Sequence, residues 1–246
     1  MYETMLAEIV NVKGHNGDII DGYVARPLGE GPYPGVILIH HMPGWDEGSK
    51  EMVRKFAYHN YIAISPNLHH REGPGTGMEV MRKLRESGGV PDDRCIGDVD
   101  GAIKYLESIP AYNGKVGVIG FCSGGRQVYL TACNIDRLNA AVCCYGGRIV
   151  AGPESLTPQQ PVAPIDMTKN MVCPILGLFG AEDQNPSPEH VKRMEEELKR
   201  FNKTYEFHTY DNAGHGFFQT EWPMYRQHAA IDGWQKIFAW YEKYLK

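Results

Sequence analysis

Short apolar runs recur along the chain, and most are followed by a longer segment in which apolar residues lie three or four positions apart. Residues 35–40 (GVILIH) and 174–179 (PILGLF) have the length and composition of strands that are buried on both faces. Residues 93–108 instead repeat apolar side chains at helical spacing, which is typical of a helix packed on one side. Strands that alternate with helices predict a mostly parallel sheet with helices on both faces.

The whole chain divides into elements in this way. We predict strands over residues 6–12, 19–25, 35–40, 61–65, 115–119, 140–145, 174–179 and 205–210. We predict helices over residues 47–59, 93–108, 124–133, 188–201 and 223–244. The first two strands flank the turn-forming residues 14–18, so we expect them to form an antiparallel pair. The length fits a single α/β domain over residues 1–246.

Two long stretches lack a regular pattern. Residues 69–92 and residues 148–170 are rich in glycine or proline. Both follow predicted strands, at the edge of the sheet where α/β proteins bind ligands. Two interpretations stay open at this point, because long irregular segments are either functional loops or ordinary surface insertions.

Composition and charge exclude several classes of protein. The formal net charge is −5 and the two signs are interspersed, which disfavours nucleic-acid binding. Residues 1–6 lack the features of a secretory signal, and no apolar run is long enough to span a bilayer. The six cysteines have no regular spacing and include no CxxC pair, so we expect neither a disulfide framework nor a zinc site. We therefore expect a cytoplasmic protein that binds neither membrane nor nucleic acid.

The segment Gly120-Phe121-Cys122-Ser123-Gly124-Gly125 carries the strongest chemical signal. It follows a predicted strand and precedes a predicted helix, with a cysteine at the apex and glycines two positions to either side. A sharp strand-to-helix turn strains its central residue and needs small neighbours at these positions. The turn also lifts the central side chain above the sheet, beside the N–H groups of a helix start. Cys122 is therefore the candidate nucleophile, and Ser123, one position further on, is the alternative.

A cysteine nucleophile needs a base and a residue that orients the base. Asp183 lies just after the strand over residues 174–179, and His215 lies in a glycine-flanked loop after the next strand. Nucleophile, acid and histidine then follow one another in the order that α/β-hydrolases use. We predict that His215 exchanges protons with Cys122 and that Asp183 fixes the imidazole tautomer, with Glu182 as the alternative acid.

The remaining chemistry follows from the loop after the strand over residues 35–40. We expect the backbone N–H groups of Met42 and Ser123 to stabilise an oxyanion. The histidine pairs at 40–41 and 69–70 point in divergent directions and lack a carboxylate at ligand spacing. We therefore expect no metal and no other cofactor.

These motifs resemble those of the dienelactone hydrolase family of α/β-hydrolases, over most of the chain. The matching pieces are residues 120–126, 180–183 and 213–217, together with the arginine-bearing loop at 68–75. The resemblance implies an α/β-hydrolase fold and a Cys122–His215–Asp183 triad that opens lactones or cleaves esters without a cofactor. It also implies that Arg71 binds a substrate carboxylate.

The chain departs from the bacterial members of that family at two positions. A glutamate that helps to control the thiol is replaced by His41, and the second carboxylate-binding arginine is replaced by Gln219. A neutral amide cannot supply the charge of a guanidinium, which favours a less acidic or more aromatic substrate. A protonated His41 would favour the Cys122 thiolate, so we expect that thiol to ionise more readily than in members with glutamate.

Aromatic residues near the expected mouth of the site have two interpretations. Trp45, Phe218 and Trp222 either line an apolar substrate pocket or simply pack the fold.

The sequence as a whole predicts a hydrolase that cleaves an ester or lactone of a small molecule through a covalent acyl-enzyme. A thioesterase or carbon–carbon bond hydrolase with the same triad is an alternative, and a non-catalytic small-ligand-binding protein is another. A redox-sensing Cys122 is weaker, since no sequence-adjacent cysteine could resolve an oxidised thiol. We expect a monomer or a small homo-oligomer.

Overall fold

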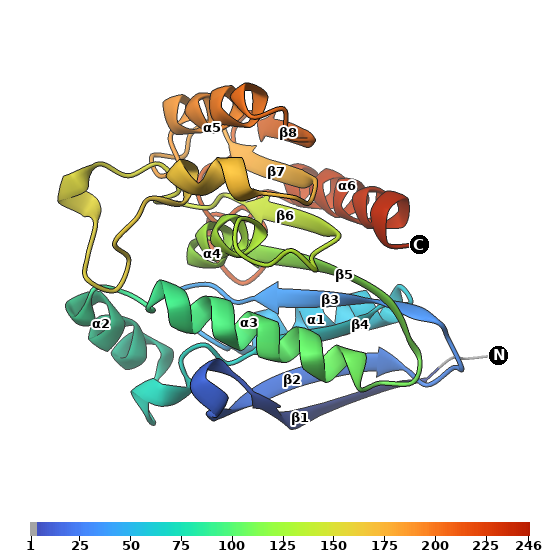
Figure 1. The fold of residues 1–246 in the computed structure, drawn as a ribbon. Coiled ribbons are helices and arrows are strands. Elements are labelled where there is room, and N and C mark those ends of the chain that lie inside the picture. The colour runs from blue at the N-terminus through green and yellow to red at the C-terminus, as the bar shows by residue number, and fades with distance from the viewer. Residues whose placement is uncertain (1–3) are drawn as a thin grey trace.

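A single eight-stranded sheet forms the centre of the computed structural model, which describes residues 4–246 (Figure 1). The strands are β1 (Met5–Lys13), β2 (Ile19–Pro27), β3 (Tyr33–Ile39), β4 (Ile62–Pro66), β5 (Tyr112–Phe121), β6 (Ala140–Cys144), β7 (Ile175–Gly180) and β8 (Tyr205–Tyr210). Their order across the sheet is β1-β2-β4-β3-β5-β6-β7-β8. β1 pairs antiparallel with β2, and β2 pairs antiparallel with β4, whereas all later pairs are parallel. The predicted parallel sheet with an N-terminal antiparallel pair is therefore confirmed.

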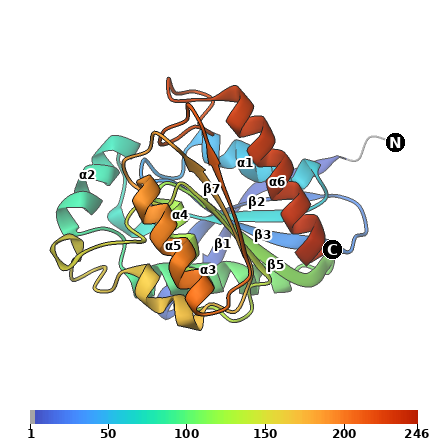
Figure 2. The ribbon, with the colours of Figure 1, turned by 90° about the horizontal axis from the view of Figure 1, so that it is seen from above.

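Helices cover both faces of the sheet (Figures 1 and 2). They are α1 (Glu47–Tyr58), α2 (Gly77–Ser87), α3 (Asp92–Glu107), α4 (Ser123–Ala132), α5 (Pro188–Arg200) and α6 (Gln227–Leu245). Figure 2 shows α1 and α6 on one side, and α3, α4 and α5 on the other. Each side has its own apolar core: Val99, Val128 and Met194 belong to one, while Phe56 and Ile237 belong to the other. This burial on both faces explains why the central strands are almost continuously apolar.

One helix lies where the sequence analysis found no regular element. α2 lies within the irregular stretch 69–92. Its start is fixed by a capping box, in which the Thr76 hydroxyl accepts from the Glu79 N–H and the Glu79 carboxylate accepts from the Thr76 N–H. Only Val80, Met81 and Leu84 of this helix are buried, so the apolar stripe is too short to reveal the helix among flanking glycines.

The C-terminal helix begins later than predicted. Residues 216–225 form successive hydrogen-bonded turns, with the N–H of Gln219 donating to Gly216 O and that of Trp222 donating to Gln219 O. Arg226 has an extended backbone and precedes the first residue of α6, Gln227.

Residues 1–3 lie outside the part of the chain that the structure describes. The predicted domain and the segment that we expect not to be a secretory signal both begin in these residues. No helix within residues 4–246 is long and apolar enough to cross a membrane.

Candidate active site

Cys122 stands at the sharp turn between β5 and α4. Its φ and ψ angles are 57° and −119°, a left-handed conformation that is strained for any residue but glycine. The turn is held from both sides, because the Cys122 N–H donates to Cys144 O and the Cys122 carbonyl accepts from Gly125. The side chain therefore sits at the N-terminus of α4, beside the first amides of that helix.

The glycines around Cys122 are required by close backbone contacts. A Cβ on Gly120 would lie 2.3 Å from Gly124 O, and a Cβ on Gly124 would lie 2.3 Å from Ile39 O. Neither neighbour is a flexible side-chain end, so a larger residue would force the backbone apart. The spacing of small residues that the sequence showed is thus a packing requirement of the turn.

A histidine and a carboxylate complete the arrangement from two other strand ends. His215 follows β8, and its Nδ1–H donates to Asp183 Oδ2, which follows β7, at 2.8 Å. The second oxygen of Asp183 accepts from the Asn185 N–H at 2.9 Å, and the side chain is only 2% exposed. The alternative acid, Glu182, has an exposed side chain. Because Nδ1 is hydrogen-bonded to Asp183, Nε2 is the ring nitrogen that can exchange a proton with Cys122.

The surroundings of His215 favour its charged form. Burial works against the imidazolium, but the hydrogen bond to Asp183 and the interaction with Cys122 outweigh it and raise the pKa of His215 to about 10. The ring also stands edge-on to that of Tyr145, with centroids 5.1 Å apart. A raised pKa makes His215 a stronger base, which can take the proton of the thiol beside it.

Cys122 and His215 open into a cavity of about 460 Å³. Met42 and Ser123, the expected oxyanion donors, both line it. Neither of their N–H groups donates to another group among residues 4–246, so both can serve a ligand. Ser123 supplies the first amide of α4, which has no partner within the helix.

Arg71 is held away from this cavity. Its guanidinium donates to both oxygens of the buried Asp98, at 2.8 and 3.0 Å, and to Asp18 at 2.8 Å. Two carboxylates already satisfy the side chain, and they raise its pKa above the ordinary value. The structure therefore does not bring Arg71 to Cys122, although the sequence placed it among the substrate-binding residues.

His41 is likewise committed elsewhere. Its Nε2–H donates to Asp46 Oδ2 at 2.6 Å, while Asp46 also caps the start of α1 through the Ser49 N–H. Partial burial opposes the charged carboxylate, but these hydrogen bonds lower the pKa of Asp46 to about 2. Asp46 would thus balance the charge of a protonated His41 and reduce its effect on Cys122.

The other expected substrate-binding residues also lie outside the cavity lining. Trp45 donates its indole N–H to Ser65 O at 3.1 Å, and Phe218 is buried against Phe121 and Trp234. Trp222 is 40% exposed beside His41, and Gln219 lies close to Gly48 at the start of α1. For Trp45 and Phe218 the structure favours the packing interpretation.

The cavity instead contains arginines that the sequence analysis did not single out for the site. Arg85, Arg126 and Arg148 all line it, from α2, α4 and the loop after β6. Arg85 and Arg148 belong to the two irregular stretches. The interpretation of those stretches as binding loops was therefore the one feature of the sequence that could have indicated these two residues.

A strained turn with a cysteine at its apex after β5, a carboxylate after β7 and a histidine after β8 on this sheet define an α/β-hydrolase. A sequence model described as "Dienelactone hydrolase family" matches residues 20–245. The chain therefore belongs to the dienelactone hydrolase family and is a hydrolase.

Similar proteins cover nearly the whole chain. A "Putative carboxymethylenebutenolidase" of Escherichia coli strain K12 is 34% identical over 235 residues, which is 93% of this chain and 84% of the relative. A Bradyrhizobium protein, "Probable 2-oxo-3-(5-oxofuran-2-ylidene)propanoate lactonase", is 28% identical over 99% of this chain and 96% of its own. The crystal structure of a "Putative Dienelactone Hydrolase" from Klebsiella pneumoniae superposes with a TM-score of 0.90 at 29% identity, covering 98% of this chain and 100% of that chain.

Proposed function

We propose that this protein hydrolyses an ester or a lactone of a small organic molecule, with Cys122 as the nucleophile. The observation that carries the proposal is the line of groups from the strained Cys122 through His215 to the buried Asp183. Each member comes from a different strand end, so only the folded sheet brings the three together. The names of the two relatives, a carboxymethylenebutenolidase and a lactonase, support a lactone as substrate.

The first half of the reaction forms a thioester. His215 takes the Cys122 proton, and the sulfur attacks the carbonyl carbon to give a tetrahedral oxyanion. The N–H groups of Met42 and Ser123 stabilise the charge that develops on that oxygen. The carbon–oxygen bond then breaks, and His215 returns the proton to the leaving alkoxide.

The second half regenerates the thiol. His215 removes a proton from a water molecule, whose oxygen attacks the thioester carbonyl. The oxyanion collapses, the carbon–sulfur bond breaks, and the proton goes back to Cys122. With a lactone substrate the alcohol stays attached to the acyl group, so a single hydroxy acid leaves. Apart from the substrate and water, every group in these steps belongs to the chain.

The test compares hydrolysis of a carboxylated lactone and a neutral short-chain aryl ester by the wild-type protein and by Cys122→Ala. We expect turnover of at least one substrate, with a loss of about 10³-fold or more in the variant. Cys133→Ala removes another cysteine, at the end of α4, and should keep wild-type turnover. Hydrolysis at the wild-type rate by Cys122→Ala would contradict the proposal. Mass spectrometry during turnover should show the acyl group on the peptide that contains Cys122.

A further inference from the structure

His69 takes no part in the reaction steps above, although it lines the cavity above Cys122. It also lines a neighbouring hollow of about 250 Å³, and within residues 4–246 it is the one residue that the two linings share. His69 therefore forms part of the wall between them, and it is only 8% exposed. A buried polar side chain at the wall of a reaction site is a candidate to bind the reacting molecule.

The turn that carries Met42 is fixed against His69. A hydrogen bond of 3.0 Å between its last and first residues closes this turn, 41–44. The ring of His40, which precedes the turn, stands edge-on to the ring of His69 with centroids 4.5 Å apart. The His40 Nε2 atom also accepts from the Leu68 N–H at 3.2 Å, so the two loops are joined. His69 thus lies beside the segment whose Met42 amide is the expected oxyanion donor.

The imidazole of His69 is uncharged at neutral pH. Burial is the main cause, and the neighbouring His40 and Arg94 add to it, which lowers the pKa of His69 to about 2. In the part of the chain that the structure describes, no carboxylate oxygen comes within 4.0 Å of either ring nitrogen to oppose this. A neutral imidazole has one N–H and one lone pair, so it can donate a hydrogen bond without giving up its proton.

The two ring nitrogens of His69 have different surroundings. Nδ1 is buried and has no hydrogen-bond partner among residues 4–246. A Cβ on Gly44 would lie 3.3 Å from Nδ1 and 3.9 Å from Cε1, so this edge of the ring faces the backbone at Gly44. Nε2 lies farther from Gly44 and is not among the buried polar atoms. A proton on Nδ1 would be a buried N–H without an acceptor, which folded proteins almost never contain, so we assign the proton to Nε2.

We propose that the Nε2–H of His69 donates to the carbonyl oxygen of the molecule that Cys122 attacks, as a third donor beside the N–H groups of Met42 and Ser123. This hydrogen bond strengthens as the oxygen gains charge in the tetrahedral intermediate, and an uncharged ring can supply it without proton transfer. The assignment of that oxygen to an ester or lactone rests on the proposed function. The donor itself does not, because any carbonyl compound that adds to the Cys122 sulfur places an oxyanion there.

The closing experiment makes three measurements on each variant. They are kcat for whichever of the carboxylated lactone and the neutral ester is hydrolysed, the rate at which iodoacetamide alkylates Cys122, and the Kd of trifluoroacetophenone, measured by protection of Cys122 from alkylation. Addition of the ketone forms a carbon–sulfur bond, opens the carbon–oxygen double bond and passes the thiol proton to His215, which leaves an oxyanion. Alkylation only displaces iodide and forms no oxyanion, so it reports the thiol alone.

His69→Phe keeps a ring but removes the N–H. We expect kcat to fall about 10²-fold and ketone binding to weaken about tenfold or more, with the alkylation rate unchanged. His69→Gln places an amide N–H where Nε2 lies and should restore most of both losses, whereas His69→Asn places its amide where Nδ1 lies and should not. The control is His70→Phe, an exposed change at the next residue, which lines neither the cavity nor the hollow and should match the wild-type protein.

Unchanged kcat and ketone affinity in His69→Phe would overturn the inference. Equal losses in all three measurements would also overturn it, because a purely structural role for His69 would impair the thiol as well. If His69→Phe does not fold, the other two variants decide, and equal ketone affinity in His69→Gln and His69→Asn would count against the inference. Failure of the proposed function alone would appear as ketone binding that still depends on His69, without any Cys122-dependent hydrolysis.

Discussion

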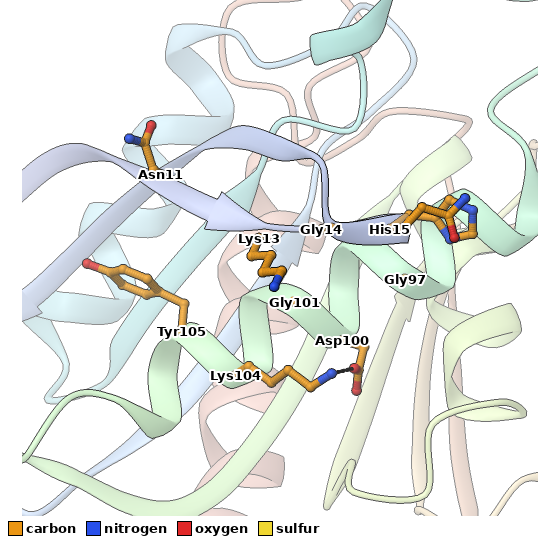
Figure 3. Close-up of a pocket in the computed structure, with 11 residues that line it drawn as sticks. Asn11, Lys13, Gly14, His15, Gly97, Asp100, Gly101, Lys104 and Tyr105 are labelled. Atoms are coloured by element: carbon orange, nitrogen blue, oxygen red, sulfur yellow. Dashed lines mark ion pairs between the residues drawn. The ribbon is translucent and has the colours of Figure 1, made fainter.

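The cavity above Cys122 is smaller than a second hollow, which lies between the end of β1, the turn that follows it, and α3 (Figure 3). The volumes are about 460 and 640 Å³. In the larger hollow, Figure 3 shows Lys104 paired with Asp100, and Asp100 also accepts from Arg137. The smaller cavity has the strained Cys122 and two N–H groups, those of Met42 and Ser123, that have no acceptor among residues 4–246. Volume therefore does not locate the chemistry, whereas strain and unsatisfied polar groups do.

The largest difference between the two regions is expected when one aspartate in each is replaced by asparagine. Asp183→Asn removes the charge that orients His215, and we expect kcat for the best substrate to fall about 10³- to 10⁴-fold. Asp100→Asn, in the larger hollow, should leave kcat unchanged. Steady-state kinetics on the two purified variants makes the comparison. Equal losses in both would show that the larger hollow also takes part in turnover.

The three chemical groups could be predicted because each closely follows a short apolar run. Once the runs are taken as parallel strands, their ends must meet at one edge of the sheet, and Cys122, Asp183 and His215 come together without any knowledge of side-chain geometry. Met42 and Ser123 follow by the same logic from the turns they occupy.

The contacts of the expected substrate-binding residues could not be predicted in this way. The position of Arg71 in its motif is clear from the sequence, but its partner, Asp98, lies on α3 and is visible only in the fold. The hydrogen bond between His41 and Asp46 is likewise visible only in the fold. A residue's partners depend on packing between distant segments, and a resemblance transfers positions more reliably than it transfers contacts.

The next largest difference between the two regions is expected in the free energy of unfolding, when a buried and an exposed ion pair are each broken. Asp92→Asn leaves Arg126 buried without a counter-charge, and we expect the free energy of unfolding to fall by about 3–5 kcal/mol. Asp100→Asn breaks exposed pairs and should cost about 1 kcal/mol or less. Urea denaturation of both variants gives the two values. The double variant Asp92→Leu/Arg126→Met should be milder than Asp92→Asn, since it removes both charges. A double variant less stable than Asp92→Asn would contradict the assignment of the cost to an uncompensated charge.

The smallest effect concerns pH and is best measured with Cys122 replaced by alanine, so that the thiol does not titrate. Hydrogen bonding to Asp183 raises the pKa of His215 above its ordinary value of 6.5. A raised pKa stabilises the folded state at low pH, and the contribution is lost as the pH rises through the folded-state pKa. The free energy of unfolding of Cys122→Ala should therefore decline as the pH rises above 6.5, over a shorter range than in the wild-type protein, because the contribution of Cys122 to the raised pKa of His215 is gone. Adding His215→Gln should flatten this decline, whereas adding Asn11→Ala, a non-titrating change in the larger hollow, should leave it unchanged. A decline that survives His215→Gln in full would show that other groups, and not the His215–Asp183 bond, set the pH dependence.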